Sequence, residues 1–389
     1  MRNEHWLLPE GIDEILPPES TRMEGLRREL IDLYRSWGYE QIVPPFIEFV
    51  ESLLSNASED LDLQTFKLTD QMSGRTLGIR ADITPQAARI DAHRLRREAP
   101  TRLCYVGAVL LTRSDDFGGS RSPMQVGCEL YGHRGVESEL EVLSLMLETL
   151  RRAGIDDIYL DLGHVGIFRG LTRQAGLDEA QELALFEALQ RKALAEIDER
   201  LADLALPAKQ AAMLRALGEL SGENALQRGR TLLAAASPEV QQALAELEAL
   251  AQRINQRLPD LPLHFDLAEL RGYHYHTGVV FAAYAPGLGQ EMARGGRYDA
   301  VGEVFGRGRP ACGFSADLKT LLHFGRRPEG GEPSLIFAPA DADAEVIQAL
   351  RAQGRRVVRA LPGQTAGAAE MGCGEELQLL QGRWVPTPV

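Results

Sequence analysis

The chain has 389 residues, enough for about two to three domains of ordinary size. It carries 42 basic and 56 acidic side chains, a formal net charge of −14, and 44% of its residues are hydrophobic. This balance argues against global disorder, and against nonspecific binding to nucleic acid or an anionic membrane, because both kinds of binding need excess positive charge. The four cysteines lie far apart without a CxxC pair, which disfavours a zinc finger and a disulfide framework. Without a run of 18 apolar residues or a leader-like start, a soluble, cytoplasmic protein is expected.

Strand and helix patterns alternate over the first part of the chain. The N-terminal 20 residues are rich in Pro, Gly and acids and predict an extended arm. A capping box of Thr21 and Glu24 predicts the start of the first helix, which runs to Gly38. Further helices are predicted from Thr84-Pro85 and over 137–152. Strands are predicted over 41–49 (interrupted by two prolines), 66–68, 75–79, 102–112, 123–131 and 158–162.

The chain then changes character. Residues 177–258 are rich in Ala and Leu and carry no strand signal, which predicts a helical insertion over about 175–260 in a strand-rich domain. Strands return over 264–266, 273–283 and 290–293, followed by a helix from about residue 316. We therefore expect an α+β fold with a largely antiparallel sheet.

The end of the chain is expected to be separate. Residues 1–325 form the expected core and 326–333 a linker. Residues 334–389 predict strand, helix, strand and a hairpin, a short C-terminal α/β region. Since one βαβ unit takes about 30 residues, a domain of several such units does not fit there.

Polar residues stand at two places where strands need none. Arg80, Asp82 and Thr84 recur at a spacing of two, which on an extended backbone puts all three on one face, able to hold an ammonium or hydroxyl group. The alternative is a solvated strand end that caps the next helix. Gln125 and Glu129 share one face of a later strand, opposite apolar residues. The alternative there is simple exposure to water.

A third segment, Leu270–Phe281, is followed by a glycine pair at 295–296, which allows close approach to a ligand or simply makes a turn. His264, His274 and His276 could hold a metal, but no carboxylate or Cys completes an ordinary ligand set, so no metal is expected. The chain lacks the P-loop, the nucleophile elbow and the HExxH zinc motif. No catalytic residues for phosphoryl or glycosyl transfer, and no cofactor, are predicted.

Together these segments resemble the catalytic core of class II aminoacyl-tRNA synthetases, specifically histidyl-tRNA synthetase, over roughly residues 5–325. The resemblance implies an antiparallel sheet flanked by helices with a helical insertion. The segments that carry it are Tyr39–Pro45 (motif 1), Cys104–Gly107 through Gly127–Gly132 (motif 2), Arg271–Gly278 with Gly295–Asp299 (the histidine signature), and Ala311–Leu318 (motif 3).

The departures from the synthetase pattern concern ATP. The arginine position of motif 2 falls on Leu111, with Arg113 displaced by two residues, and that of motif 3 falls on Thr320. In the family these arginines grip the ATP phosphates, each contact being worth about 1.5–3 kcal/mol. Losing both corresponds to a rate loss on the order of 10²–10⁴. Adenylation of histidine is therefore expected to be very slow. Whether Arg113 compensates for the missing arginine at Leu111 stays open.

The amino-acid side is better preserved. The resemblance implies that Asp82, Thr84 and Gln125 hold the ammonium of histidine, Glu129 its imidazole and Arg271 its carboxylate. Tyr275 keeps one of two adjacent tyrosines of the family, His276 replaces the other, and Tyr273-His274 replace a Leu-Asp pair. The expected histidine-binding residues, none of them catalytic, are Asp82, Thr84, Gln125, Glu129, Arg271, Tyr275, His276 and Tyr298.

This chain keeps the residues expected to bind the amino acid and lacks those expected to bind the ATP phosphates. In this combination it is similar to the regulatory subunits of ATP phosphoribosyltransferase. The segment Phe117–Gln125 with Gly127–His133 looks like that subfamily, and the short C-terminal region resembles only the start of an anticodon-binding domain. The resemblance implies a non-catalytic homodimer within a hetero-octamer that activates a short-form catalytic subunit. It also implies feedback inhibition by L-histidine in the first step of histidine biosynthesis, without nucleic acid or membrane. Two alternatives remain: a working histidyl-tRNA synthetase with rearranged ATP contacts, and a synthetase-like enzyme that activates another small molecule.

Overall fold

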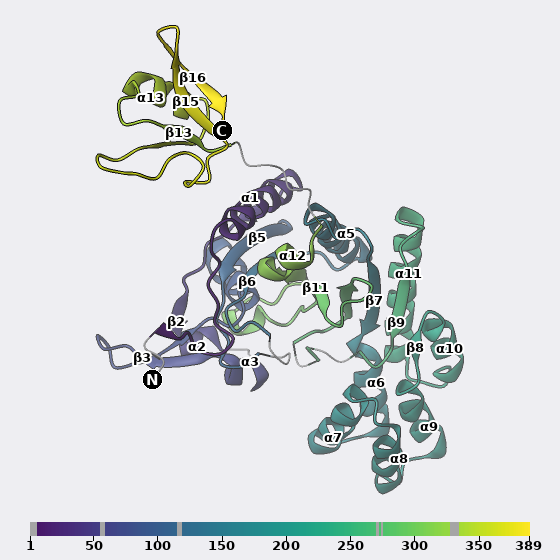
Figure 1. Ribbon diagram of the computed structural model, residues 1–389. Coiled ribbons are helices and arrows are strands. Elements are labelled where there is room, and N and C mark those ends of the chain that lie inside the picture. Colours follow the sequence, from purple (N-terminus) through teal and green to yellow (C-terminus); the bar gives the residue numbers. More distant parts are fainter. Residues whose placement is uncertain (1–5, 55–58, 115–118, 270–271, 274, 327–333) are drawn as a thin grey trace, which may run out of the picture. The chain divides into compact units, whose positions relative to one another are not determined.

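The computed structural model describes residues 6–54, 59–114, 119–269, 272–273, 275–326 and 334–389 (Figure 1). The chain divides into two units, Met1–Arg326 and Arg327–Val389. None of the described helices is long and apolar enough to cross a membrane.

A nine-stranded sheet forms the centre of the first unit. Its neighbouring strands are antiparallel, except that β1 pairs with β5 and β7 with β9 in parallel. The α+β class with a largely antiparallel sheet is confirmed. In spatial order the strands are β1 (Glu40–Gln41), β5 (Thr101–Ala108), β6 (Met124–Tyr131), β12 (Ala311–Asp317), β11 (Glu291–Arg297), β10 (Val279–Tyr284), β7 (Tyr159–His164), β9 (Leu263–Asp266) and β8 (Ser221–Gly222).

Strand β12 was not predicted, although it lies in the middle of the sheet. Most of its residues are buried, so the strand lacks the alternation of apolar and polar residues that marks a half-exposed strand. It pairs with β6 over seven residues and with β11 over four. The early part of motif 3 is therefore strand, and the expected helix begins two residues later than predicted, as α12 (Leu318–Phe324).

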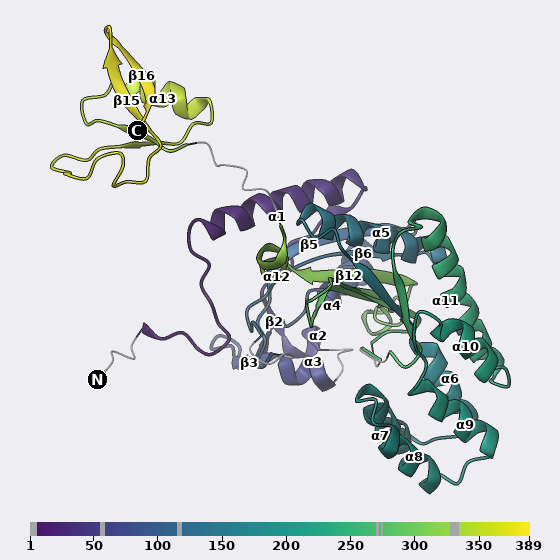
Figure 2. The ribbon, with the colours of Figure 1, turned by 45° about the vertical axis from the view of Figure 1, so that its right-hand side comes forward.

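Helices α1 (Glu19–Ser36), α5 (Val136–Arg152) and α12 pack on the sheet; Figure 2 shows α1 and α5 above β6 and β12. Val126, Cys128 and Leu130 point from β6 into this apolar layer. Helix α1 begins after Pro18 without a side-chain cap, so the predicted capping box at Thr21 is wrong. The first-turn N–H groups of Ser20 and Thr21 donate to the carbonyls of Leu16 and Pro18, so the helix begins earlier and these groups need no side-chain cap.

The opposite side carries a smaller sheet, ordered β2 (Ile47–Phe49), β4 (Thr76–Ile79), β3 (Phe66–Thr69), with antiparallel pairs. The predicted strand 41–49 is therefore two strands in two sheets, separated at Pro44-Pro45, because proline cannot donate to a ladder. The short helices beside this sheet are α2 (Val50–Leu53), α3 (Glu59–Gln64) and α4 (Thr84–Arg89), the last continuing in a π-helical turn over Ile90–Leu95.

Six helices lie between β7 and β9, on the right of Figure 1. Their buried Leu, Ile and Phe residues join the same apolar layer as α1 and α5. They are α6 (Val165–Ala175), α7 (Glu179–Gln190), α8 (Leu194–Asp203), α9 (Ala208–Leu217), α10 (Ala225–Leu232) and α11 (Pro238–Arg257).

The predicted strand 273–283 is wrong in its first half. Strand β10 begins only at Val279, and the described residues before it, 272–273 and 275–278, form turns and bends. The N–H groups of Tyr275 and His276 both donate to the carbonyl of Gly272 at 2.8 Å, and Gly272 has a φ of 67°. Such a left-handed residue starts a turn instead of continuing a strand.

The second unit contains β13 (Ile336–Ala338), α13 (Ala344–Ala352), β14 (Val357–Arg359) and the hairpin β15 (Glu375–Leu380)–β16 (Arg383–Pro388). The sheet order is β14-β13-β15-β16, with β13 parallel to both neighbours. The hairpin turns at Gln381-Gly382, both with positive φ, as a tight two-residue turn requires. Ile336, Ile347, Val357 and Leu377 form a core of their own.

Candidate functional site

A buried carboxyl, that of Glu129, lies at the centre of the site. Glu129 is on β6 with only 1% of its surface exposed. The Tyr105 hydroxyl donates to one carboxyl oxygen at 2.9 Å and the Tyr298 hydroxyl donates to the other. A Cβ at Gly313 on the neighbouring strand would overlap this carboxyl, so glycine is required there. Burial raises the pKa of Glu129 to about 8, against the opposing effect of the two tyrosine hydrogen bonds.

A second carboxylate, that of Asp82, collects donors next to it. Its Oδ1 accepts from the Thr84 N–H and hydroxyl, both at 3.0 Å, and from the Gln125 amide Nε2 at 2.7 Å. The amide oxygen of Gln125 accepts from the N–H of Ile83 at 2.8 Å, which fixes the orientation of the amide. The Thr84 hydroxyl lies 3.2 Å from the Tyr105 hydroxyl. Through this contact the Asp82 and Glu129 groups form one polar network.

Arg80 is not part of this network, so the prediction that Arg80, Asp82 and Thr84 share one face is wrong. The chain bends after Ile79, where β4 ends. The Arg80 guanidinium donates to the carbonyls of Ala108 and Pro44, each at 2.9 Å. It therefore ties the end of β5 to the segment before β2.

Aromatic rings line the other side of Glu129. The ring of Tyr275 lies 5.0 Å from that of Tyr298, and the Tyr275 hydroxyl is buried without a hydrogen-bond partner among the described residues. His276 Nδ1 lies 3.2 Å from the carbonyl oxygen of Gly272, and its ring meets Tyr275 edge-on. His276 is thus half-buried beside the site. Arg271 and His274 lie outside the described residues.

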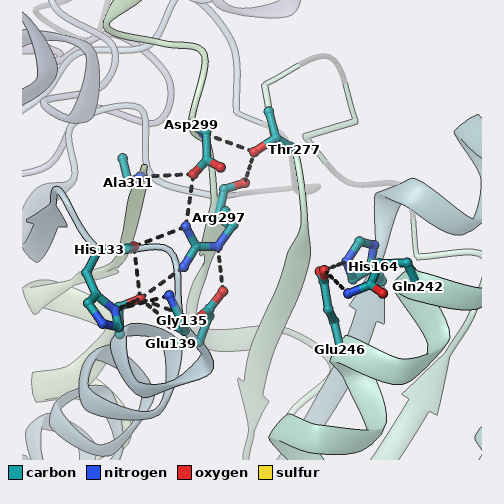
Figure 3. A network of polar contacts seen from close by, with 11 residues as sticks. His133, Gly135, Glu139, His164, Gln242, Glu246, Thr277, Arg297, Asp299 and Ala311 are labelled. Atoms are coloured by element: carbon teal, nitrogen blue, oxygen red, sulfur yellow. Dashed lines mark hydrogen bonds and ion pairs between the residues drawn. The ribbon is translucent and has the colours of Figure 1, made fainter. Parts of the chain in front are cut away.

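Arg297, the last residue of β11 and the neighbour of Tyr298 in sequence, is fastened by several polar contacts, which Figure 3 shows. Its guanidinium donates to Glu139 at 2.5 Å, to the Ser138 hydroxyl at 2.9 Å and to Asp299 at 3.0 Å. Successive residues of a strand point to opposite faces, so Arg297 faces α5 while Tyr298 faces Glu129. The sequence analysis assigned no role to this arginine.

Within the described part of the chain, no group of three His, Cys, Asp or Glu residues could hold a metal. His264, considered with His276 as a ligand, instead lies 3.1 Å from Asp161.

Two family models match the chain. The model described as histidyl-tRNA synthetase matches residues 11–321, and that described as ATP phosphoribosyltransferase subunit HisZ C-terminal domain matches residues 333–387. The chain is 56% identical over 402 residues to the ATP phosphoribosyltransferase regulatory subunit of Alkalilimnicola ehrlichii, covering 100% of this chain and 98% of that relative. It belongs to the family of ATP phosphoribosyltransferase regulatory subunits. Its identity to the family member from Pseudomonas aeruginosa is 55%, with 99% and 98% covered.

Solved structures agree with this family. A crystal structure described as an ATP phosphoribosyltransferase regulatory subunit/histidyl-tRNA synthetase from Bacillus halodurans matches with a TM-score of 0.82 at 30% identity, covering 94% of this chain and 95% of that one. Histidyl-tRNA synthetase from Nostoc matches with a TM-score of 0.76 at 19% identity over 98% and 97% of the two chains. The expected class II synthetase-like fold is confirmed. The names of these relatives also agree with the expectation of a regulatory subunit that is not itself the catalyst.

In this regulatory-subunit family member, Leu111 and Thr320, where the resemblance places the ATP-binding arginines of the synthetases, make hydrogen bonds within the fold. The N–H of Leu111 donates to the carbonyl of Arg121 at 2.8 Å. The Thr320 hydroxyl donates to Asp317 at 2.9 Å, in the first turn of α12. Neither side chain offers a positive charge to a phosphate, and Arg113 is exposed.

Tyr105 is a residue of the candidate site that the sequence analysis missed. It is fully buried, and its hydroxyl contacts both Glu129 and Thr84, the partner of Asp82. Because Tyr105 stands among apolar residues of a strand, its sequence position predicts only a core residue. A signal for it existed: in the pairing of β5 with β6, Tyr105 stands opposite Gly127, two residues before Glu129. A large side chain opposite a glycine, beside a buried acid, indicates a contact across the strands.

Proposed function

We propose that this chain is the regulatory subunit of an ATP phosphoribosyltransferase, and that its Asp82–Glu129 pocket binds free L-histidine as the effector. The names of relatives that match nearly the whole chain support the first part. The observation that carries the second is the convergence of Asp82, Gln125, Glu129 and Tyr298 in one polar network. The exchange of both ATP-binding arginines supports a sensor over an adenylating enzyme.

The chemistry of the pocket suits an amino acid with an imidazole ring. Asp82 supplies an anion for the ammonium, and Thr84 and Gln125 already surround that carboxylate. Glu129 supplies a carboxyl that accepts from, or donates to, a ring nitrogen according to its protonation. Tyr275 adds a buried hydroxyl, and Arg271 is the proposed partner of the histidine carboxylate.

The finer assignments belong to the same proposal. Residues 1–325, with the insertion at about 175–260, are the proposed histidine-binding core, 326–333 a linker and 334–389 a separate C-terminal region. The proposed assembly is cytoplasmic, with a homodimer of this chain in a hetero-octamer with short-form catalytic subunits. Histidine inhibits by the difference in its affinity for the active and inhibited states, a coupling of about 1–3 kcal/mol in ordinary cases.

Calorimetric titration of the purified chain with L-histidine and then with ATP tests the pocket. We expect binding of histidine and none of ATP. In the complex reconstituted with the catalytic subunit, Asp82→Ala and Glu129→Ala are expected to abolish inhibition by histidine while the chain stays folded. Asp157→Ala, a change of an exposed carboxylate, serves as the matched control.

Three outcomes would contradict the proposal. Inhibition of both variants at wild-type histidine concentrations would remove the pocket assignment. Tight ATP binding, or pyrophosphate exchange that depends on histidine and ATP, would favour the synthetase-like enzyme instead. Activation of a different small molecule would appear as ligand-dependent thermal stabilisation by that compound and not by histidine.

A further inference from the structure

The turn that carries Tyr275 and His276 is held by the helical insertion. Besides the two N–H bonds to Gly272, the described part of this turn makes hydrogen bonds to other elements of the fold. The N–H of Thr277 donates to the carbonyl of Arg297 at 2.8 Å, and the N–H of Val165, the first residue of α6, donates to that of Gly278 at 3.1 Å. The order of the turn therefore depends on what it packs against.

Tyr273 inserts its side chain into the insertion. Only 4% of its surface is exposed, and its ring packs against Phe168 of α6 at 5.4 Å and Phe186 of α7 at 5.5 Å. Its hydroxyl donates to Glu182 of α7 at 2.6 Å. The other oxygen of that carboxylate accepts from Thr172 of α6 at 2.9 Å. This is a position where the synthetase pattern has a leucine, which could not make the hydrogen bond.

Arg169 of α6 holds the same turn by its backbone. Its guanidinium lies over the Tyr273 ring, 4.8 Å from the ring centre, and donates to the carbonyls of Tyr273 at 2.9 Å and His276 at 3.2 Å. Both ends of the turn are thus fastened by one side chain.

Helix α6 is itself fixed at its start. His164 Nδ1 accepts from the N–H of Gly166 at 3.0 Å, so the neutral ring carries its proton on Nε2, which lies 3.1 Å from Glu246 of α11 (Figure 3). The α6 residues that hold the turn therefore project from a fixed helix.

On its other side the turn reaches the pocket. Tyr275 packs on Tyr298, whose hydroxyl donates to Glu129. We propose that Arg169, Glu182 and Tyr273 are positioning residues that couple the packing of α6 and α7 to the Glu129 pocket. The two states are a turn docked on the insertion, with Tyr275 placed against Tyr298, and an undocked turn. By reciprocity, a ligand that binds only when the turn is docked stabilises α7. A change that loosens α7 therefore weakens the binding of that ligand.

Hydrogen exchange of the full chain tests the coupling without any ligand. Tyr273→Phe and Glu182→Ala are each expected to speed exchange about tenfold both in α7 and in the peptide 272–280, the effect of one buried hydrogen bond to a carboxylate. The double variant should be no faster than Glu182→Ala alone, because that change already removes the bond from Tyr273 together with the one from Thr172. Tyr159→Phe, which changes a tyrosine stacked on Tyr284 at the far end of β10, is the matched control and should leave both regions unchanged. Additive effects, or an unchanged turn, would overturn the coupling.

Addition of L-histidine gives the second readout, which alone rests on the proposed function. We expect histidine to slow exchange in α7 of the wild type, and its dissociation constant to rise about tenfold in Tyr273→Phe and Glu182→Ala. Glu182→Gln, which can still accept from Tyr273, should restore wild-type affinity. Histidine binding with unchanged α7 exchange would refute the coupling. If the wild type binds no histidine while the ligand-free coupling is present, the histidine assignment fails and the coupling stands.

Discussion

At the scale of single residues, the buried carboxyl of Glu129 lies at the centre of the candidate site. Both of its oxygens accept hydrogen bonds from tyrosine hydroxyls, which stabilise a carboxylate less than a cation would. Desolvation therefore dominates and raises its pKa to about 8. A ligand at the proposed site therefore meets Glu129 mostly as a neutral carboxyl near neutral pH.

This raised pKa predicts a specific dependence of stability on pH. The folded chain keeps a proton on Glu129 between the ordinary pKa of about 4.5 and the raised value of about 8, whereas the unfolded chain has lost it. This group's contribution to the free energy of unfolding is therefore fully present below the lower value and declines as pH rises, by up to about 1.4 kcal/mol per pH unit. Glu129→Gln removes this decline, so in urea unfolding its stability relative to wild type should increase from pH 5 to 8 and then level off. Parallel stability curves would contradict the raised pKa.

A second residue-scale prediction concerns the space beside this carboxyl. Gly313→Ala places a Cβ where the Glu129 carboxyl lies, so we expect a loss of about 1–3 kcal/mol in stability and loss of histidine binding. Gly25→Ala is the matched control, because Gly25 lies in α1 with no atom near its added Cβ. It should stabilise the chain by about 0.5–1 kcal/mol. Chemical denaturation and calorimetry measure both effects.

At the scale of elements, the site depends on how β11 is fastened to α5. The Arg297 guanidinium reaches Glu139, Ser138 and Asp299 at once, which needs a planar fork with several donors. The strand is thereby held from one face while it presents Tyr298 on the other. The glycines at 295 and 296 let it lie close to its neighbours, since a Cβ at Gly296 would touch the ring of His276.

Arg297→Lys therefore keeps the charge but loses most of these bonds. We expect the free energy of unfolding to fall by about 2–4 kcal/mol, since buried groups are left without partners. Arg294→Lys on the same strand changes an exposed arginine that contacts Glu291, and should cost less than about 0.5 kcal/mol. Equal effects of the two changes in urea unfolding would show that the buried network does not fasten β11.

At the scale of the whole molecule, the chain has two units with separate cores. All described residues of the proposed pocket lie in the first, so a chain ending at Arg326 should fold and bind histidine with an unchanged dissociation constant. Titration calorimetry of the shortened chain measures this. A large loss of affinity in a chain that is still folded would show that the C-terminal region contributes to the pocket.

Much of the fold could be predicted from local patterns. The strand pair β3–β4 and the helices between β7 and β9 follow from local sequence patterns. The pair β5–β6 follows from the alternation of polar and apolar residues along β6, although most of β6 is buried. Strand β12 could not be predicted in this way because its residues lack such an alternation of polar and apolar side chains. The turn before β10 was mistaken for a strand because its apolar side chain, Tyr273, is buried by distant helices and not by a sheet.

The sequence by itself determined which residues share a strand face, such as Gln125 and Glu129, because side chains alternate along a strand. The resemblance of its motifs to histidyl-tRNA synthetase indicated the family. Only the tertiary structure decided which partners meet: Glu129 and Tyr298 are 169 residues apart, and Tyr273 and Glu182 are 91 apart. Spacing along a chain does not encode such contacts, since the packing of whole elements brings them together. The bend after Ile79, which separates Arg80 from Asp82, was decided in the same way.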